Sequence, residues 1–246
     1  NNLKINFIFK SNTFISDKME WNNKFTYPKS SRSTEDGFRK YLFGEEKLPS
    51  VTSVLNATKS EEDKISLELW KKRVGYAEAN KIKNEASSRG TSMHSYIEQY
   101  LQGRVNLSFF ESNEKYKNMA KEIIDKGIKD KLTEIWGIET TLHYPKKYAG
   151  TADLVGIYQG REAIIDFKQA NKPKKEDYIQ DYFLQLGAYT LAHNVVYDTN
   201  ITLGVILVCT VDNLFQDFKI EGPELLMYQN LFLGRLKKFN EMNNIT

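Results

Sequence analysis

The stretch that most constrains the fold is GTADLVGIYQGREAIIDFKQ, which runs from Gly150 to Gln169. Its apolar residues lie on both faces of a predicted β-hairpin, which is typical of a sheet that is covered on both sides. Asp153, Asp166 and Lys168 nevertheless lie inside it. Because charged side chains are rarely buried without partners, these three residues predict a special site within the core.

A two-residue turn at Gln159–Gly160 sets the expected register of this hairpin. That register places Asp153 directly opposite Asp166 and Thr151 opposite Lys168, with all four side chains on one face of the sheet. The other face is expected to be ordinary core and pairs Leu154 with Ile165 and Ala152 with Phe167.

Two carboxylates that face each other across a hairpin repel, and burial strengthens the repulsion. Three interpretations are open. Lys168 forms a structural salt bridge with one acid, one acid keeps its proton, or a divalent cation lies between Asp153 and Asp166. In the third case the oxygen ligands suit magnesium or manganese. Lys168 then projects from the same face, where it can orient a water molecule or stabilise charge that develops on a phosphate.

The remaining patterns predict strands and turns over residues 1–50, with a hairpin that turns near Gly44, and then helices before a sheet. In the helix expected at 60–85, Ile65, Leu69 and Trp70 are expected on the packed side. The other helices are expected at 51–58, 89–101, 116–128, 179–196 and 223–242, and the strands at 135–144, 148–158, 162–169, 201–211 and 215–220. No linker interrupts the chain, so one domain is expected over 1–246, with an N-terminal part at 1–86 and a core at 87–246.

Composition excludes several classes of protein. The formal net charge of +3 is too small to indicate a nucleic-acid binder by itself. Cys209 is the only cysteine, which excludes an internal disulfide, a four-cysteine zinc site and an iron–sulfur cluster, and it is expected to be a buried thiol. Residues 1–14 lack a signal-peptide pattern, and no apolar run approaches the roughly 18 residues of a membrane span. An intracellular protein without membrane contact is therefore expected.

The motifs, taken in order, resemble a known group of enzymes. G-x-x-D at Gly150–Asp153 and D-x-K at Asp166–Lys168 follow RGTSMH, which ends at His94, and precede QLGAY, which holds Gln185 and Tyr189. This order is similar to the PD-(D/E)xK nuclease superfamily, and from residue 48 onward it is most similar to the group of mitochondrial genome maintenance exonuclease and its phage relatives. The resemblance implies an α/β (α+β) fold with a restriction-endonuclease-like core, in which helices flank a central mixed β-sheet, preceded by an N-terminal hairpin and a helical arch.

The resemblance also implies roles for individual residues. His94, Asp153, Asp166 and the backbone carbonyl of Phe167 would bind Mg²⁺ or Mn²⁺, and Lys168 would assist the attacking water. Gln185 and Tyr189, one helical turn apart, would support the site or the DNA backbone, although such a pair can also be plain core hydrogen bonding. Glu139, in the preceding strand, is either an acid that orients water or metal, or an exposed strand glutamate, and the second interpretation is favoured.

Basic and polar residues on both sides of the acids predict contacts with nucleic acid. Tyr178 offers a ring on which a base of single-stranded DNA could stack. The hydroxyl groups of Ser50 and Thr52 either cap a helix or contact a phosphate. The expected basic contacts are Arg89, Lys146, Lys147, Lys172, Lys174 and Lys175.

The sequence therefore predicts a metal-dependent DNA exonuclease that acts on single-stranded DNA with a free end. Two alternatives are kept: a structure-specific or duplex endonuclease on the same core, and a DNA-binding module without catalytic activity. The expected setting is DNA processing such as recombination, in the cytoplasm of a bacterium or a phage-infected host. The sequence leaves the oligomeric state open.

Overall fold

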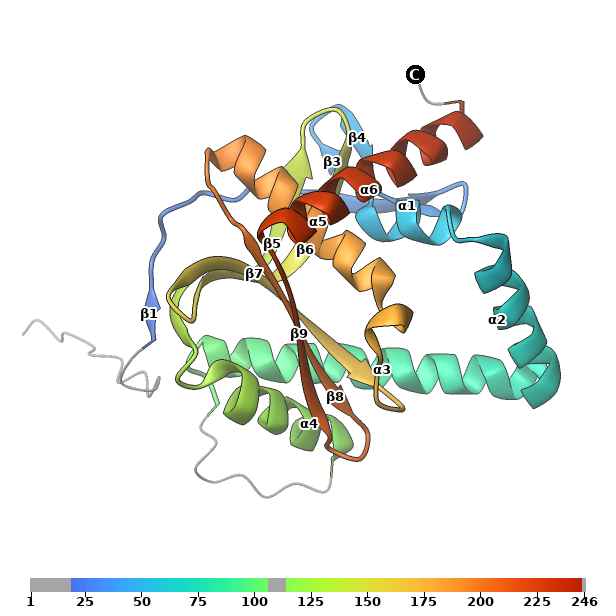
Figure 1. Cartoon of the computed structure of the whole chain (residues 1–246), viewed down its shortest axis with the longest axis horizontal. Coiled ribbons are helices and arrows are strands. Elements are labelled where there is room, and N and C mark those ends of the chain that lie inside the picture. The colour runs from blue at the N-terminus through green and yellow to red at the C-terminus, as the bar shows by residue number, and fades with distance from the viewer. Residues whose placement is uncertain (1–18, 106–113, 245–246) are drawn as a thin grey trace, which may run out of the picture.

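The computed structural model describes residues 19–105 and 114–244 (Figure 1). The segment 1–14, in which the sequence shows no signal-peptide pattern, lies outside the described residues. No described helix combines the length and the apolar character needed to cross a bilayer.

A six-stranded mixed sheet forms the centre of the molecule (Figure 1). Its strands lie in the order β1-β5-β6-β7-β8-β9, and the pairs β1–β5 and β7–β8 are parallel, whereas the other neighbours are antiparallel. The strands are β1 (Glu20–Trp21), β5 (Leu132–Tyr144), β6 (Tyr148–Tyr158), β7 (Arg161–Ala170), β8 (Leu203–Thr210) and β9 (Phe215–Glu221). The predicted order of helices and strands after residue 89 is confirmed, and β6 has the predicted bounds.

Helices cover both faces of this sheet, which confirms the predicted fold class of a central mixed sheet flanked by helices. One apolar cluster joins the sheet to α1 (Val51–Ala57), α5 (Gln180–Tyr197) and α6 (Gly222–Met242). The other cluster joins it to α3 (Tyr76–Leu101), α4 (Lys115–Ile123) and the π-helical turn that follows at Ile124–Ile128.

Strand β8 shows why its sequence is an uninterrupted apolar run. All of its residues are buried. Ile206 and Val208 pack into the cluster with α5, whereas Val205, Leu207 and Cys209 pack into the cluster with α3. A strand between two layers of helices needs apolar side chains on both faces. The prediction that Cys209 is a buried thiol is confirmed.

A second, three-stranded antiparallel sheet precedes the helices. It consists of β2 (Ser31–Glu35), β3 (Phe38–Phe43) and β4 (Glu46–Pro49). The predicted hairpin turn near Gly44 is confirmed, and this glycine has a φ of 62°. Tyr41 and Leu48 of this sheet pack against Ala149 of β6, so the small sheet lies against the central one.

The helical region between the two sheets differs from its prediction. Two helices were expected, at 60–85 and at 89–101. The structure instead has a shorter α2 (Glu61–Val74) and one long α3, and the break between them lies at Gly75. Gly75 has φ 90° and ψ 138°, a conformation that is open almost only to glycine. The residues at 86–88 therefore continue a helix.

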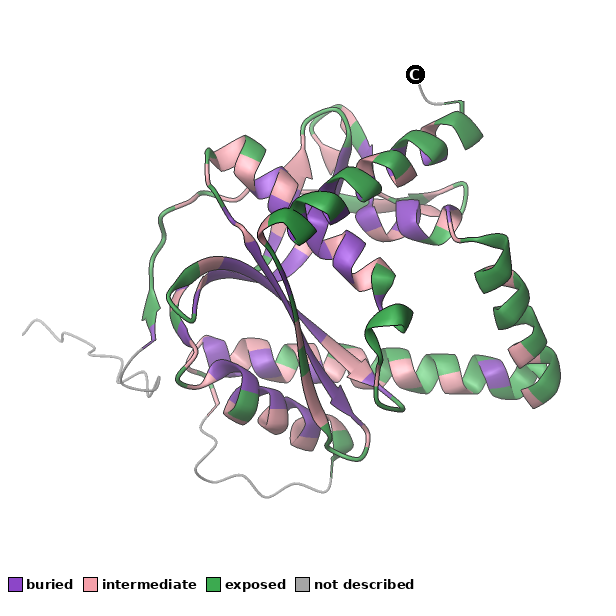
Figure 2. Ribbon diagram, in the orientation of Figure 1, coloured by how far each residue is buried: buried purple, intermediate pink, exposed green. Residues whose placement is uncertain are grey.

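Helix α2 projects along one side of the molecule and buries none of its residues (Figure 2). The prediction that Ile65, Leu69 and Trp70 form a packed side is wrong for the first two, which are 57% and 60% exposed. Trp70 is half-buried. The helical period of these residues was correct, but no element of the described chain covers them.

Candidate active site

The β6–β7 hairpin has the predicted register near its turn. Tyr158 pairs with Arg161 and Leu154 pairs with Ile165, but the regular pairing of the two strands ends there. The direct pairing of Asp153 with Asp166 is therefore not formed. Asp153 Oδ2 instead accepts a hydrogen bond from the Phe167 backbone N–H at 2.7 Å. The two strands part at the acids, and a side chain replaces the missing ladder contact.

The expectation that Ala152 and Phe167 share one face of ordinary core is wrong. Ala152 packs into the cluster with α5, whereas Leu154 and Phe167 pack into the cluster with α3. Residues two apart on a regular strand point to the same side, so β6 changes sides at Asp153. This irregularity places the carboxylate between the two helical layers.

Strand β5 is irregular at the same level. Ile138 pairs with Leu154 and Thr140 pairs with Ala152, which leaves Glu139 beside Asp153 without a regular pair. Glu139 has a φ of 49°, a left-handed conformation that is uncommon for this residue type. The backbone turn aims the glutamate toward Asp153 and His94.

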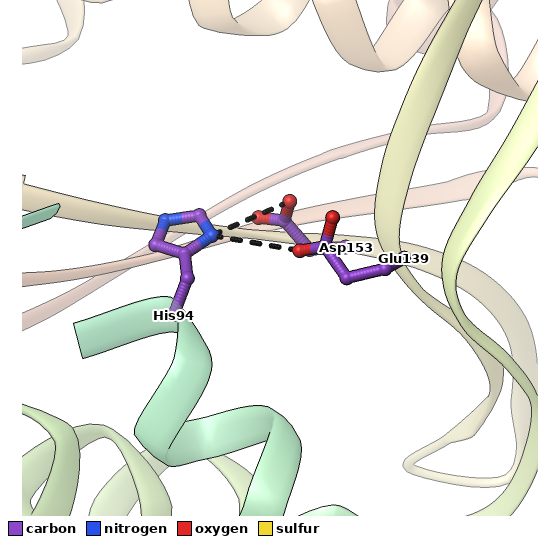
Figure 3. A group of neighbouring side chains, drawn as sticks. All are labelled: His94, Glu139 and Asp153. Atoms are coloured by element: carbon purple, nitrogen blue, oxygen red, sulfur yellow. Dashed lines mark ion pairs between the residues drawn. The ribbon is translucent and has the colours of Figure 1, made fainter. Parts of the chain in front are cut away.

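His94 reaches these acids from α3, and its imidazole points between the two carboxylates (Figure 3). His94 Nδ1 lies 3.5 Å from Asp153 Oδ1 and 3.9 Å from Glu139 Oε1. One ligand atom from each of the three side chains lies within 4.8 Å of the others, so the group could hold a metal ion. Met93 and Ile97 on the same helix are fully buried and fix its position against the sheet.

The charges in this group support one another. Burial alone would lower the pKa of His94, but Asp153 and Glu139 outweigh burial and raise it to about 10. Burial alone would raise the pKa of Asp153, but the His94 cation, Lys168 and the Phe167 N–H outweigh burial, so this pKa is lowered. The imidazolium of His94 therefore balances the negative charge of Asp153.

Asp166 and Lys168 form a second buried pair within the site. Lys168 Nζ makes an ion pair with Asp166 Oδ2. No hydrogen bond of good geometry from the described residues satisfies that oxygen, which is fully enclosed. Burial and the nearby Asp153 raise the pKa of Asp166 to about 6, against the pull of Lys168 and His94. Of the three interpretations from sequence, the salt bridge is present, but it leaves this buried oxygen incompletely satisfied.

Helix α5 supports Lys168 from the other side. Lys168 Nζ donates a hydrogen bond to Gln185 Oε1 at 3.2 Å, and Gln185 Nε2 donates to Tyr189 Oη at 3.0 Å. Gly150 makes room for this chain of contacts, because a Cβ at that position would lie 2.4 Å from Tyr189 Cε1. The first residue of G-x-x-D and the last residue of QLGAY are therefore in contact.

All of these side chains line one open cavity of about 650 Å³. Its walls also include Ser50 and Thr52 from the start of α1, and Arg32, Arg39 and Tyr41 from the small sheet. Ser50 is buried and caps α1 by accepting a hydrogen bond from the Ser53 N–H, so its helix-capping role is present. The cavity brings acids, a lysine and two arginines together from segments far apart in the chain.

The donor set fits a divalent cation. His94, Glu139 and Asp153 offer one nitrogen and carboxylate oxygens within reach of one another, and Asp166 adds a buried oxygen that lacks a full set of partners. Carboxylate oxygens are the ligands that Mg²⁺ and Mn²⁺ prefer.

The other residues expected to contact nucleic acid lie outside this cavity. Arg89 Nε donates to Gln169 Oε1 at 3.0 Å, so its guanidinium is engaged beside the end of β7. Lys147 lines a different cavity with residues of α6 and lies over the Tyr144 ring. Tyr178 is 78% exposed. Lys146, Lys172, Lys174 and Lys175 are also absent from the cavity lining.

Sequence analysis missed part of the site. Glu139 is exposed, as expected, but it also lies beside His94 and Asp153. The sequence shows Glu139 only as an acidic residue in a strand next to the hairpin, and this pattern alone does not indicate a place in the site. Arg32 and Arg39 were not considered, because nothing in the order of residues links the small sheet to the acids.

Sequence comparison finds relatives of this chain in several vertebrates. The chain is 30% identical to mitochondrial genome maintenance exonuclease 1 of Mus musculus over 211 residues and 27% identical to that of Homo sapiens over 208 residues. Each match covers 79% of this chain, and the chain spans 58–59% of the length of these relatives. The chain is thus a homologue of these exonucleases, which confirms the resemblance found in its motifs.

The other comparisons add little. No family model matches the chain. Among solved structures, an alkaline exonuclease from Laribacter hongkongensis aligns with 61% of this chain and 82% of its own length at 14% identity, with a TM-score of 0.30.

The expected bacterial or phage-infected cytoplasm is wrong. The matched relatives are named as mitochondrial proteins and come from human, mouse and Xenopus tropicalis. The lack of a signal-peptide pattern and of a membrane span led only to the expectation of an intracellular protein, and the bacterial or phage setting came from the phage members of the resembled group.

Proposed function

We propose that this homologue of mitochondrial genome maintenance exonuclease 1 is a divalent-metal-dependent DNA exonuclease that acts on single strands with a free end. One observation carries the proposal. His94 of α3, Asp153 of β6, and Asp166 and Lys168 of β7 converge in one open cavity, where the buried Oδ2 of Asp166 has an ion pair with Lys168 but no hydrogen bond of good geometry. A fold gains no stability from such a group by itself, so a ligand is the simplest reason for it.

In this proposal Asp153, Asp166 and His94 hold the cation, together with the backbone carbonyl of Phe167. A bound Mg²⁺ or Mn²⁺ polarises a phosphoryl oxygen and lowers the pKa of a bound water. The hydrogen bond between Phe167 N–H and Asp153 fixes the carboxylate and orients this stretch of β7. The imidazole must lose its extra proton before it can act as a ligand.

Lys168 is the residue that acts on the reacting groups. Gln185 holds its ammonium group through a hydrogen bond, and Tyr189 holds Gln185. Burial alone would lower the pKa of Lys168, but the carboxylates of Asp166 and Asp153 outweigh burial and raise this pKa, so the ammonium group stays charged. A fixed ammonium can orient the attacking water and stabilise the negative charge that develops on the phosphate.

End-labelled linear single strands, linear duplexes and covalently closed single-stranded circles, incubated with Mn²⁺ and with a chelator, test the proposal. We expect the linear single strand to be degraded, the circle to survive, and the chelator to stop the reaction. Cleavage of the circle would favour an endonuclease. Binding without cleavage, in any metal, would favour a module that lacks catalytic activity.

Asp166→Asn tests the assignment of the site. We expect cleavage to fall by at least about a hundredfold while binding of the single strand remains, because the amide keeps the shape and loses the charge. Asp212→Asn is the matched control, since Asp212 is exposed in the turn between β8 and β9. Equal activity of the two variants would contradict the proposed site.

A further inference from the structure

Arg32 and Arg39 line the cavity of the acids although they belong to the small N-terminal sheet. We propose that these two arginines form a phosphate-binding subsite, which holds the phosphate next to the one that is cleaved. The inference rests on the proposed function for the position of the cleaved phosphate. It assigns to β2 and β3 the task of holding the nucleic-acid backbone.

The strand register puts both arginines on one face of the small sheet. Arg32 pairs with Tyr41, and Thr34 pairs with Arg39. Residues two apart on a strand, and residues directly opposite each other, share a face, so Arg32, Arg39 and Tyr41 lie on the same side. Tyr41 is buried against Ala149 of β6, whereas Arg32 and Arg39 on the same side are exposed and line the open cavity.

Two contacts attach this face to β6 close to the acids. Arg32 Nη2 donates a hydrogen bond to Thr151 Oγ1 at 3.3 Å, and Tyr41 Oη lies 3.0 Å from the same oxygen. The Arg32 guanidinium lies 5.5 Å from the centre of the Tyr41 ring, which helps to hold it in place. Thr151 is thus the link between the small sheet and the strand that carries Asp153.

The charged residues on the two faces of the small sheet differ in whether they form ion pairs. On the opposite face, where Phe38 packs against Phe239 of α6, Lys40 and Lys47 both form ion pairs with Glu35, at 3.2 and 2.9 Å. On the face toward the cavity, neither Arg32 nor Arg39 forms an ion pair with any described residue. Two guanidinium groups on diagonal positions repel each other. An anion between them would remove that repulsion, and guanidinium groups bind phosphate oxygens in pairs.

The distance between Thr151 and Asp153 suits two adjacent phosphates of one nucleic-acid strand. Thr151 and Asp153 are two residues apart on β6, which corresponds to a separation of about 6.6 Å along the strand. Neighbouring phosphates of an extended nucleic-acid strand are separated by a similar length. A phosphate beside Asp153 therefore places the next phosphate near Thr151, where Arg32 is anchored.

The first test is the salt dependence of binding to a fluorescein-labelled single-stranded oligonucleotide, measured by anisotropy in EDTA so that nothing is cleaved. Loss of the contact to the one phosphate that both arginines hold should reduce the slope of log K against log salt by about 0.7. We expect this reduction, and a weaker affinity by at least about tenfold at low salt, for Arg32→Gln/Arg39→Gln. Circular dichroism checks that the double variant is folded.

The matched control is Lys40→Gln/Lys47→Gln, which removes the same charge from the opposite face of the same sheet. We expect its slope to remain close to that of the unaltered protein. Equal reductions in both double variants would overturn the subsite, because the effect would then come from net charge alone.

The second test places a single neutral methylphosphonate linkage at successive positions of the strand. The unaltered protein should bind more weakly when the neutral linkage adjoins the cleaved one, and the arginine double variant should lose this position dependence. A profile that is the same in both proteins would overturn the subsite. Cleavage by the unaltered protein, measured separately in Mn²⁺, tests the proposed function. If the protein binds through the arginines but never cleaves, the result supports the subsite and contradicts the proposed nuclease activity.

Discussion

At the scale of single residues, the candidate site concentrates features that a stable core would avoid. Asp153 and Asp166 are 9% and 2% exposed, and Glu139 adopts a left-handed backbone beside them. A non-glycine residue in that region costs on the order of 1 kcal/mol or more. The strained backbone of Glu139 and the repulsion between the acids occur at the same place, and His94 neutralises part of this charge. This combination supports a functional origin for the arrangement.

Glu139 provides a prediction at this scale. If its carboxylate contributes to a cation site with His94 and Asp153, then Glu139→Gln weakens Mn²⁺ binding by about tenfold. The free energy of unfolding gained in a fixed excess of Mn²⁺ should fall by about 1.4 kcal/mol. Denaturant titrations with Mn²⁺ and with a chelator measure this gain. The gain would be the same in both proteins if Glu139 were only a surface residue, as its strand position first indicated.

The chemistry of single residues was partly predictable. Asp153, Asp166 and Lys168 stand out because charges in a doubly covered strand are rare. Gln185 and Tyr189 were expected to share a helix face, and they do form a hydrogen bond. The turn of β5 at Glu139 could not be foreseen, because period-two alternation carries no information about a single residue that leaves the strand conformation.

At the scale of elements, the contact between β6 and α5 positions the lysine. Gly150 lies against Tyr189, and Tyr148 Oη donates a hydrogen bond to the Ala188 carbonyl at 2.8 Å. The helix therefore lies close to the strand directly below the acids. A glycine at this place is required by the close approach rather than by a turn.

Gly150→Ala is predicted to disturb this contact. The added methyl group would lie 2.4 Å from Tyr189 Cε1, so the ring must move, and overpacking of this kind costs about 1–3 kcal/mol of stability. Thermal unfolding measures the loss. Gly234→Ala is the control, because a Cβ there meets nothing within 4 Å. That exposed helix position should become more stable by up to about 1 kcal/mol. A loss of equal size in both variants would contradict the packing argument.

The elements themselves were predictable where one period persists over several turns or residues. The bounds of β6 were correct, and those of α5 differ by one residue at each end. The failure at α2 and α3 has a local cause, since Gly75 interrupts a helical pattern that otherwise continues. Ile65 and Leu69 show a second limit, because periodicity predicts a face but not a neighbour to cover it.

At the scale of the whole molecule, the site depends on contacts between distant parts of the chain. The small sheet reaches Thr151 through Arg32 and Tyr41, and His94 reaches Asp153 from a different layer. Local patterns contain no record of such contacts. The motif order nevertheless placed His94 with the acids, because a resemblance to a family carries information on the fold as a whole.

The segment before the small sheet is joined to the core by His193 of α5. His193 Nε2 lies 3.1 Å from Tyr27 Oη, and Nδ1 lies 2.8 Å from Thr199 Oγ1. Phe25 and Trp136 also contact the imidazole. This histidine is fully buried, and its contacts give it a structural role.

Acidification should loosen this junction. Burial, with a smaller effect from Lys24, lowers the pKa of His193 from 6.5 to about 4. Between these values the unfolded chain binds a proton that the folded protein does not, so stability falls as the pH falls through this window. At 1.36 kcal/mol per pKa unit, the loss of stability reaches about 3 kcal/mol near pH 4.

The variant His193→Gln tests this prediction, because glutamine cannot take up this proton. Denaturant titrations from pH 7.5 to 4 should show the stability advantage of the unaltered protein over His193→Gln shrinking by about that amount, because all other titrating groups are common to both. Parallel curves would mean that His193 is protonated in the folded protein and that the junction tolerates its charge.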